Sequence, residues 1–399
     1  MKLNIIKFIP FSVLLITISS VSHLMKIPIN NTFVWWTLQA IILISFISAR
    51  KFFFNPAESA KLLPIYAFLA WNIICIIRGG FAAENYWDWK NLVGTAMVLL
   101  LPLSIYISTN PQIIQLILNN WIKYALPGLI IMLPLFKPSD ALGRYLVPMS
   151  FLALFLPLLT KKWKIITCLL VAGVILSNFD ARSNVLKYGA SLGLGLMFLL
   201  FHKLSKRLLE PVRILMMVLP IVLFILALTG QFNVFKMDEY IKGNYTATVV
   251  ENGEVKENSL TVDTRTFLYE EVLTSAEKND YIWLGRTPAR GNDSESFGSF
   301  SLEELKIGRM ERFENEVSIL NTFTWTGLIG VILYFVIFYR ASCLAINRSN
   351  NMLLKILGLY VGFRWAYAWV EDFSNFDLSY FFLWIMIGMC FSASFRRMA

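Results

Sequence analysis

The chain has 399 residues, of which 57% are hydrophobic and 15% aromatic, while only 16% are charged. Its mean hydropathy is +0.60, and this composition excludes a water-soluble globule, a disordered chain, a disulfide scaffold and a coiled coil. The net charge is +10, and the four cysteines indicate neither a disulfide framework nor a metal site. The sequence therefore predicts an all-α, polytopic membrane protein.

Twelve apolar runs approach the length of about 20 residues that a helix needs to cross a bilayer. These predicted spans are 4–24, 33–49, 62–79, 92–109, 113–135, 144–160, 163–179, 184–201, 212–230, 317–339, 352–370 and 377–394. The first run also fits a cleaved signal peptide, because Lys2 and Lys7 precede it and serines end it. No clean small-x-small cleavage site follows, so we predict an uncleaved helix.

The distribution of lysine and arginine predicts the orientation of these helices. With the N-terminus in the cytoplasm, the inside loops hold 17 Lys and Arg residues, against Glu58 and Glu210 as carboxylates. Cytoplasmic loops are enriched in Lys and Arg, so we predict that both termini are cytoplasmic. The positive net charge is thus mainly a topology signal and does not indicate a nucleic-acid partner.

The polar segment 231–316 lies outside on this topology, and it divides the chain into three parts. We predict an N-terminal bundle of about nine helices (1–230), a large periplasmic loop or lid (231–316) and about three C-terminal helices (317–399). The segment contains 17 carboxylates and 10 Lys and Arg residues, a net charge of −7. That balance agrees with a location outside the cytoplasm.

The polar segment has sequence signals for ordered structure. Asp263 or Thr264 is a candidate cap for a helix through Phe267–Leu273, which Asn279-Asp280 ends. Glycine and proline at 285–291 predict a turn-rich loop. Further on, a capping-box pattern predicts the start of a second helix at Ser301 and Glu304.

Common catalytic motifs are missing from the sequence. It contains no P-loop, HExxH, CxxC pair or GxSxG, and its only histidines, His23 and His202, adjoin apolar runs. Nucleotide hydrolysis, zinc chemistry and serine hydrolysis therefore have no sequence support. Any chemistry at the outer face must use arginine, glutamate and aspartate.

Two arginines stand out by position. Arg182 lies between two apolar runs at the outer surface, where an ionisable group needs a counter-ion or a cavity. The alternative for Arg182 is an ion pair with Asp180 or a snorkelling interfacial anchor. Arg265 opens the predicted loop helix, and its alternative is a solvated helix residue.

A further group of charges directly precedes the helix that begins near 317. Arg309, Arg312, Glu314 and Glu316 gather there at the membrane entrance. Guanidinium groups match phosphate oxygens bidentately, and a partly desolvated carboxylate can accept a proton from a sugar hydroxyl. The alternative is an interfacial charge network that only fixes the loop.

Three short elements in this order resemble a known family. They are Asp180-Ala181-Arg182-Ser183 between two helices, Trp283-Leu284-Gly285 in the loop, and Thr-Gly-Leu-Ile-Gly at 326–330. Together with the layout of the whole chain, they resemble the O-antigen ligase and O-antigen polymerase superfamily. The resemblance implies a metal-independent glycosyltransferase of the bacterial inner membrane, which needs no cofactor and takes a glycan from an undecaprenyl-diphosphate carrier.

The resemblance also implies roles for individual arginines. Arg182 is similar to the family's arginine between paired helices, and Arg265 to the arginine that opens the loop helix. Both are expected to bind the diphosphate. Arg312, Arg286 and Arg290 are further candidates for that role.

The candidate bases are Glu316 and Glu314, and they distinguish the branches of the family. Ligases have a His-Asn pair eleven residues before the first glycine of the 326–330 element, where this chain has Glu316 and Val317. No histidine occurs in the polar segment, so the sequence favours a polymerase. The alternative is that the glutamate is a structural partner of Arg312 or Arg265.

The expected reaction is inverting transfer of a glycan to the hydroxyl of another lipid-linked repeat unit. The expected partners are the lipid-linked oligosaccharide donor, a glycan-lipid acceptor, membrane lipid and other polysaccharide-assembly proteins. A ligase that modifies lipid A core is one alternative, and a transporter or flippase of the same lipid is another. A transporter is disfavoured because the chain does not divide into evident repeats.

Overall fold

The computed structural model describes residues 2–29, 31–54, 61–137, 140–177, 182–201, 205–240, 246–251, 254–259, 263 and 265–398. For residues 2–6, 182, 237–238, 246–251 and 254–259 it describes the backbone alone. Helices dominate these ranges, and the strands within them form two small two-stranded sheets. The prediction of a mostly helical chain is therefore confirmed.

The N-terminal part of the chain is a series of helices joined by short links. They are α1 (Lys2–Val21), α2 (Thr32–Phe53), α3 (Leu63–Ala82), α4 (Tyr86–Leu99), α5 (Ile105–Ser108), α6 (Pro111–Asn120), α7 (Leu126–Met132), α8 (Ala141–Tyr145), α9 (Val147–Ala153), α10 (Lys161–Ser177), α11 (Arg182–Leu200) and α12 (Lys206–Leu228). Asn31, Asn85, Asn110 and Ser205 begin four of them, because their side chains accept hydrogen bonds from the unpaired N–H groups of the first turn.

The C-terminal part consists of α16 (Ser318–Asn347), α17 (Met352–Tyr367), α18 (Leu378–Phe391) and α19 (Ala393–Arg397). All 14 residues of α18 are buried. This helix contacts α5, α9, α16 and α17, and a helix that is apolar on every side belongs in the interior of a bundle. The helix core is therefore built around α18.

Eight helices in the described ranges are long and apolar enough to cross a membrane. They are 7–24, 32–53, 63–82, 86–108, 111–135, 183–200, 206–228 and 318–347. Apolar side chains such as Leu215, Val222 and Ile225 of α12 point outward and are exposed. A face of this kind is unfavourable in water and suits a lipid surface. The chain is therefore a helical protein with candidate membrane spans.

The other four predicted runs are helical but shorter. Pro148 and Pro157 interrupt the run at 144–160, where α9 and a 3-10 turn replace one continuous helix. Helices α10, α17 and α18 have 17, 16 and 14 residues, which is shorter than the typical span of about 20 residues. The structure thus supports about eight candidate spans, and the predicted count of twelve is not confirmed.

The polar segment contains short elements between α12 and α16. They are α13 (Met237–Tyr240), β1 (Thr246–Glu251), β2 (Glu254–Ser259), α14 (Thr266–Lys278), β3 (Asn292–Asp293), α15 (Gly298–Glu303) and β4 (Glu311–Arg312). The predicted first helix is confirmed as α14, because Asp263 Oδ1 accepts hydrogen bonds from the backbone N–H groups of Arg265 (3.0 Å) and Thr266 (2.9 Å). The other candidate cap, Thr264, lies outside the described residues. The helix ends at the predicted site, where Asp280 has a φ of 51°.

The predicted start of the second loop helix is wrong. Helix α15 begins at Gly298, three positions before Ser301, and the Ser301 hydroxyl donates to the carbonyl oxygen of Glu311 (2.5 Å) instead of capping a helix. The hairpin of β1 and β2, paired from Thr246 with Ser259 to Glu251 with Glu254, is an addition to the predicted all-α fold. Its sequence signal is Asn252-Gly253, a dipeptide typical of two-residue hairpin turns.

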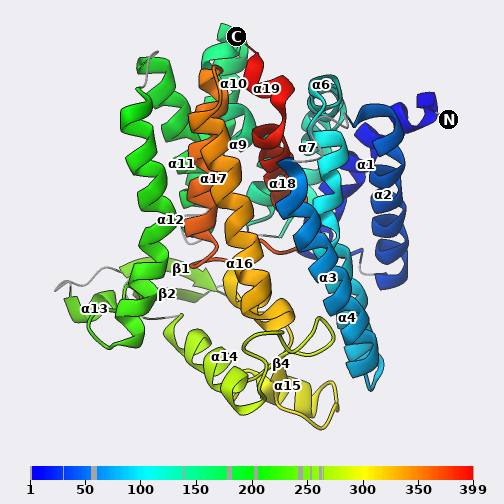
Figure 1. Cartoon of the computed structure of the whole chain (residues 1–399), viewed down its shortest axis with the longest axis vertical. Coiled ribbons are helices and arrows are strands. Elements are labelled where there is room, and N and C mark those ends of the chain that lie inside the picture. The colour runs from blue at the N-terminus through cyan, green and yellow to red at the C-terminus, as the bar shows by residue number, and fades with distance from the viewer. Residues whose placement is uncertain are drawn as a thin grey trace.

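Figure 1 shows the arrangement of these elements along the long axis. The N- and C-terminal ends lie towards one end of the helix bundle, while α14 and α15 cover the opposite end. The polar segment thus forms a separate layer beneath the bundle. Two of the three sequence elements that resemble the family, 283–285 and 326–330, meet where this layer joins α16.

Helix α16 is kinked at Gly327, whose φ of 69° and ψ of −174° are accessible only to glycine. The kink exposes backbone N–H groups, so that Leu328 donates to the carbonyl of Ile282 (2.8 Å) and Ile329 to that of Trp283 (3.3 Å). A side chain at Gly285 or Gly327 would collide with the backbone of the other segment. The Trp-Leu-Gly turn and the Thr-Gly-Leu-Ile-Gly helix therefore form one docking joint.

Candidate functional site

Two cavities meet at the end of the helix bundle that the polar segment covers. One, which we name the charged cavity, has a volume of about 260 Å³ and includes Arg144, Ser183, Lys187, Glu314, Glu316 and Glu371 in its wall. The other, the aromatic cavity, has a volume of about 590 Å³ and includes Trp35, Trp36, Gln39, Trp87, Lys90, Asn91 and Trp325. Glu314 and Asn375 belong to the walls of both.

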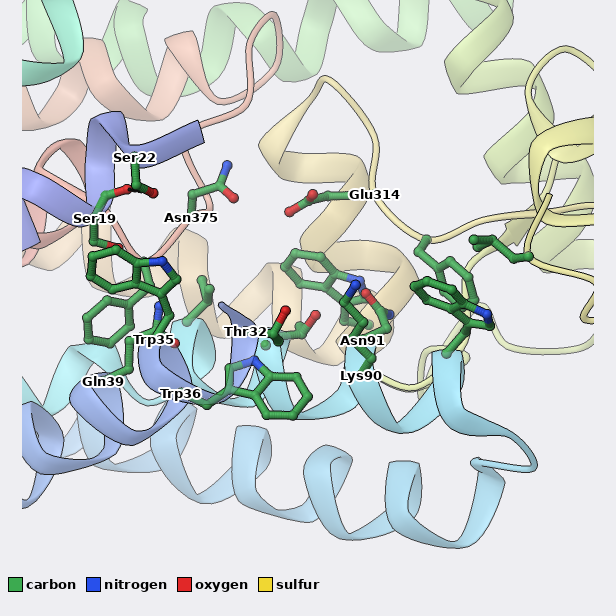
Figure 2. A pocket seen from close by; sticks show the side chains of 18 residues that line it. Ser19, Ser22, Thr32, Trp35, Trp36, Gln39, Lys90, Asn91, Glu314 and Asn375 are labelled. Carbon is green, nitrogen blue, oxygen red and sulfur yellow. Dashed lines mark hydrogen bonds between the residues drawn. The ribbon is translucent and has the colours of Figure 1, made fainter. Parts of the chain in front are cut away.

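Glu314 is the residue that links the two cavities. Figure 2 shows its carboxylate pointing into the aromatic cavity on the side of Asn375. Glu314 is exposed, because solvent reaches its side chain through the cavity, but protein atoms surround it closely. Desolvation by the surrounding protein, followed by repulsion from Asp372, raises the pKa of Glu314 to about 7. This carboxylate can therefore exchange a proton near neutral pH.

Glu316 has a different environment two residues further on. Its Oε2 lies 2.6 Å from Arg265 Nη1 and its Oε1 lies 3.5 Å from Arg312 Nη2. Both carboxylate oxygens are thus engaged by guanidinium groups. Within the described ranges the side chain of Glu314 has no such ion pair, although the Glu314 carbonyl accepts a hydrogen bond from Arg312 Nε (2.9 Å). Of the two predicted bases, Glu314 is the one with an unoccupied carboxylate.

Arg265 connects three segments beside the charged cavity, where it contacts the wall residues Glu316 and Glu371 without being a wall residue itself. Besides the ion pair with Glu316, its Nη2 lies 3.7 Å from Glu371 and its Nε donates to the Val370 carbonyl (3.2 Å). Desolvation raises the pKa of Glu371 to about 7, against the opposing effect of the Arg265 charge. The guanidinium group is therefore positioned between the start of α14 and the link from α17 to α18.

Arg182 is the first residue of α11, and its side chain lies outside the described atoms. The next residue, Ser183, belongs to the wall of the charged cavity. The Tyr367 hydroxyl donates to the Ser183 carbonyl (3.0 Å), which ties the start of α11 to the end of α17. Since Arg265 contacts Glu316 and Glu371 of the same wall, the backbone of Arg182 and the side chain of Arg265 flank one cavity.

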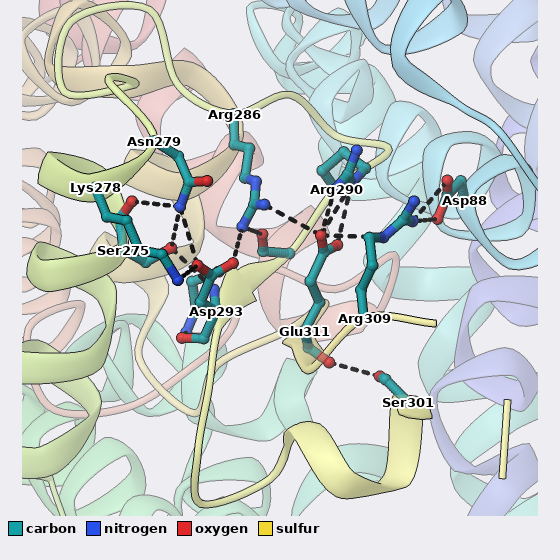
Figure 3. A network of polar contacts seen from close by, with 12 residues as sticks. Asp88, Ser275, Lys278, Asn279, Arg286, Arg290, Asp293, Ser301, Arg309 and Glu311 are labelled. Carbon is teal, nitrogen blue, oxygen red and sulfur yellow. Dashed lines mark hydrogen bonds and ion pairs between the residues drawn. The ribbon is translucent and has the colours of Figure 1, made fainter. Parts of the chain in front are cut away.

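Arg286 and Arg290 lie elsewhere, in a network around Glu311 that Figure 3 shows. Arg286 pairs with Asp293 (2.6 Å) and Glu311 (3.2 Å), and Arg290 pairs with Glu311, whose side chain is only 1% exposed. Arg309 extends the network to Asp88 of α4 (2.6 Å). Like Arg265 and Arg312, these arginines are not wall residues of either cavity in the described ranges, but their ion-pair partners are not wall residues either, and the contacts of the network join the polar segment to α4.

Several residues of the two cavities were not among the predicted site residues. Arg144, paired with Asp140 at 2.6 Å, and Lys187, one turn into α11, add positive charge to the charged cavity. Lys187 lies four residues after Ser183, so that both face the same side of α11. No sequence signal singled out Trp35 and Trp36, because sequence alone does not separate a tryptophan of an interfacial aromatic belt from one in a cavity wall.

The described ranges contain no group of three or more His, Cys, Asp or Glu side chains arranged to hold a metal ion. The wall of the charged cavity holds two cations, Arg144 and Lys187, and six carboxylates, Asp140, Glu314, Glu316, Glu371, Asp372 and Asp377, while Arg265 and Arg312 bring further positive charge to its edge through their ion pairs with Glu316. The guanidinium and ammonium groups can bind a phosphate-bearing ligand.

Comparison with protein-family models, with curated proteins and with solved structures finds no match for the chain. The resemblance to the O-antigen ligase and polymerase superfamily therefore rests on the layout and the short elements of the sequence. The chemistry of the site has to be argued from its own residues.

Proposed function

We propose that the chain is a membrane glycosyltransferase of the O-antigen polymerase type. It would transfer a glycan from an undecaprenyl-diphosphate carrier to a hydroxyl group of another lipid-linked repeat unit. The observation that carries this proposal is the position of Glu314 in the walls of both the charged and the aromatic cavity. A general base must reach the acceptor hydroxyl while the donor lies beside it, and Glu314 has that position.

In this proposal the charged cavity binds the diphosphate of the donor. Arg265 and Arg312 hold Glu316 in the absence of substrate, and phosphate oxygens compete for the same guanidinium groups because they accept the same bidentate hydrogen bonds. Lys187 and Arg144 are the cations of the cavity wall itself. The role of Arg182 stays a prediction from its position beside Ser183.

The aromatic cavity has the composition of a sugar-binding site. Its indole rings offer flat apolar faces, and the amide groups of Gln39, Asn91 and Asn375 offer both donors and acceptors. Trp325 is 1% exposed and its Nε1 has no hydrogen-bond partner in the described part of the chain. A hydroxyl group of an acceptor sugar would satisfy this donor.

The reaction follows from this division of the site. The Glu314 carboxylate removes the proton of the acceptor hydroxyl, and the oxygen forms a bond to the anomeric carbon of the donor. The bond from that carbon to the diphosphate oxygen breaks on the opposite side, so the configuration inverts. The arginines neutralise the charge that grows on the leaving diphosphate.

The finer topology is also part of the proposal. We place the twelve apolar runs in a bacterial inner membrane, with both termini in the cytoplasm and residues 231–316 on the periplasmic side. The distribution of Lys and Arg supports this orientation. The location of both termini at the end of the bundle away from α14 and α15 agrees with it (Figure 1).

The test uses the purified chain in lipid nanodiscs with lipid-linked repeat units, without ATP or added metal. The expected products are longer carrier-linked glycans and free undecaprenyl diphosphate. Glu314→Gln should lower the rate by at least about 10²-fold, the usual contribution of a general base. Glu303→Gln is the matched control, because this exposed glutamate of α15 lies in the same segment but in neither cavity wall.

Two outcomes would contradict the proposal. Transfer of the glycan to added lipid A core, without elongation of the carrier-linked glycan, would identify a ligase. Movement of the lipid between leaflets with no new glycosidic bond would identify a transporter.

A further inference from the structure

A third cavity of about 230 Å³ lies on the side of the bundle, between α12, α14 and the end of α17. Its wall consists mostly of apolar and aromatic side chains, including Leu219, Leu223, Phe224, Phe235 and Trp369. We name it the lateral groove. It extends along α12 from Leu219 to Ala227, a distance of about 12 Å at 1.5 Å per residue.

The lateral groove is continuous with the apolar outer face of α12. Leu219 contributes to the groove and is itself 42% exposed, and its neighbours Val218 and Val222 are also exposed. Helix α12 is among the candidate membrane spans. The groove therefore opens towards the lipid, and a hydrocarbon chain can enter it without crossing water.

The groove lies next to the charged cavity, since consecutive residues belong to the two walls. Val370 belongs to the groove wall, and the next residue, Glu371, belongs to the wall of the charged cavity. Arg265 donates to the Val370 carbonyl (3.2 Å), and Thr266, which follows it, belongs to the groove wall. A ligand that occupies both spaces would have an anionic group at Arg265 and an apolar chain beside α12.

One polar atom in the groove wall lacks a partner. Trp369 Nε1 is buried and has no hydrogen-bond acceptor among the described residues. The other polar groups of the wall are satisfied, since the Tyr269 hydroxyl donates to the Trp369 carbonyl (2.6 Å) and Asn233 Nδ2 to Thr266 Oγ1 (2.8 Å). The unpaired indole N–H is suited to an oxygen at the head of an amphiphile.

We propose that the lateral groove binds the first isoprene units of the donor's polyprenyl tail, while Arg265 binds its diphosphate. This inference rests on the proposed function for the identity of the lipid. A groove of this volume accepts one chain, whereas a bulk phospholipid carries two. The groove has room for a single chain, and Arg265 lies at the end of the groove next to the charged cavity. This combination favours an isoprenoid diphosphate over the surrounding lipid.

The test is photo-crosslinking of the full-length protein in nanodiscs with a polyprenyl diphosphate that carries a diazirine on its tail. Label is expected on peptides from the second half of α12 and the end of α17. Ala227→Trp and the milder Ala366→Leu, both at half-buried wall positions, fill the groove. Each should lower crosslinking and raise KM for the full-length donor about tenfold, equivalent to lost burial of about two methylene groups.

Leu215→Trp is the matched control, because Leu215 is 58% exposed on α12 and outside the groove. It should leave crosslinking and KM unchanged. The competitors are excess phosphatidylglycerol and unlabelled polyprenyl diphosphate. If both displace the label equally well, the inference is overturned, because the groove then binds ordinary lipid. Unchanged KM in both groove variants would also overturn it.

The outcome is separable from that of the proposed function. Specific crosslinking without glycan transfer would support the lipid site and contradict the glycosyltransferase. Transfer that is insensitive to both groove variants would support the enzyme and contradict the lipid site.

Discussion

Glu314 and Glu316 are two residues apart, yet their surroundings suit them to different tasks. Glu316 pairs with both Arg265 and Arg312, so it holds these two groups in place when no donor is bound. Glu314 faces two cavities and has a pKa raised to about 7. A carboxylate of this kind accepts a proton more readily than an ordinary glutamate does.

The raised pKa of Glu314 predicts the pH dependence of transfer. A base acts in its deprotonated form, and the pKa of Glu314 is raised to about 7. Below that pH the rate should fall by about tenfold per unit, and above it the rate should level off. The measurement is kcat/KM from pH 5 to 9; a profile that is flat across pH 7 would argue against Glu314 as the base.

Arg265 makes three contacts that a lysine cannot reproduce. Its planar fork reaches Glu316, Glu371 and the Val370 carbonyl together, whereas a lysine ammonium is a point charge. Arg265→Lys should lower kcat/KM by about 10²-fold, the scale of one lost stabilising donor, with little change in melting temperature. Lys278→Ala, at an exposed ion pair with Asp293, should change neither quantity.

At the scale of elements, the docking joint between α16 and the turn at 282–285 holds the polar segment against the bundle. Arg78 of α3 strengthens it by donating to the carbonyls of Leu284 (2.5 Å) and Gly285 (3.1 Å). The network around Glu311 is a second attachment, through Arg309 and Asp88. These contacts fix the chain on both sides of Glu314, so the cavities depend on them.

Gly327→Ala should therefore destabilise the protein. The φ of 69° with a ψ of −174° strains any other residue, and the added Cβ would meet the backbone of Trp283 and Gly285. We expect a loss of about 2 kcal/mol or more in the free energy of unfolding, measured by thermal denaturation in detergent. Gly189→Ala in α11, where a Cβ meets nothing within 4 Å, should be neutral or slightly stabilising.

At the scale of the whole molecule, the hydrophobic pattern predicted the positions of the helices well. Every one of the twelve apolar runs is largely helical in the described ranges. The pattern did not predict the lengths of the helices, because the long and the short helices of the bundle are both apolar. Helices α17 and α18 have 16 and 14 residues, and proline at 148 and 157 shortens a further run.

The candidate site was predictable only in part, for a physical reason. Arg265, Arg312, Glu314 and Glu316 lie within one polar segment, so their proximity could be inferred from the chain. Trp35 reaches the same site through tertiary packing alone, and no periodicity reports that. Arg286 and Arg290 could not be distinguished from Arg265 by sequence, because all three are arginines of the polar segment. In the structure the carboxylates of Asp293 and Glu311 pair with Arg286 and Arg290.

The proposed topology makes a prediction for the intact cell membrane. In a variant without native cysteines, Glu295→Cys should react with a membrane-impermeant maleimide added outside, and Arg397→Cys should react only after permeabilisation. Both positions are exposed. The reverse pattern would place the polar segment in the cytoplasm and remove it from a periplasmic substrate.

The central claim is that Glu314 performs the chemical step between two bound substrates. A single-turnover experiment with lipid-linked repeat units tests it most directly, because substrate binding and bond formation are measured separately. We predict that Glu314→Gln binds the donor as tightly as the unmodified protein does but forms the new glycosidic bond at least about 10²-fold more slowly. Bond formation at the unmodified rate in that variant would contradict the account.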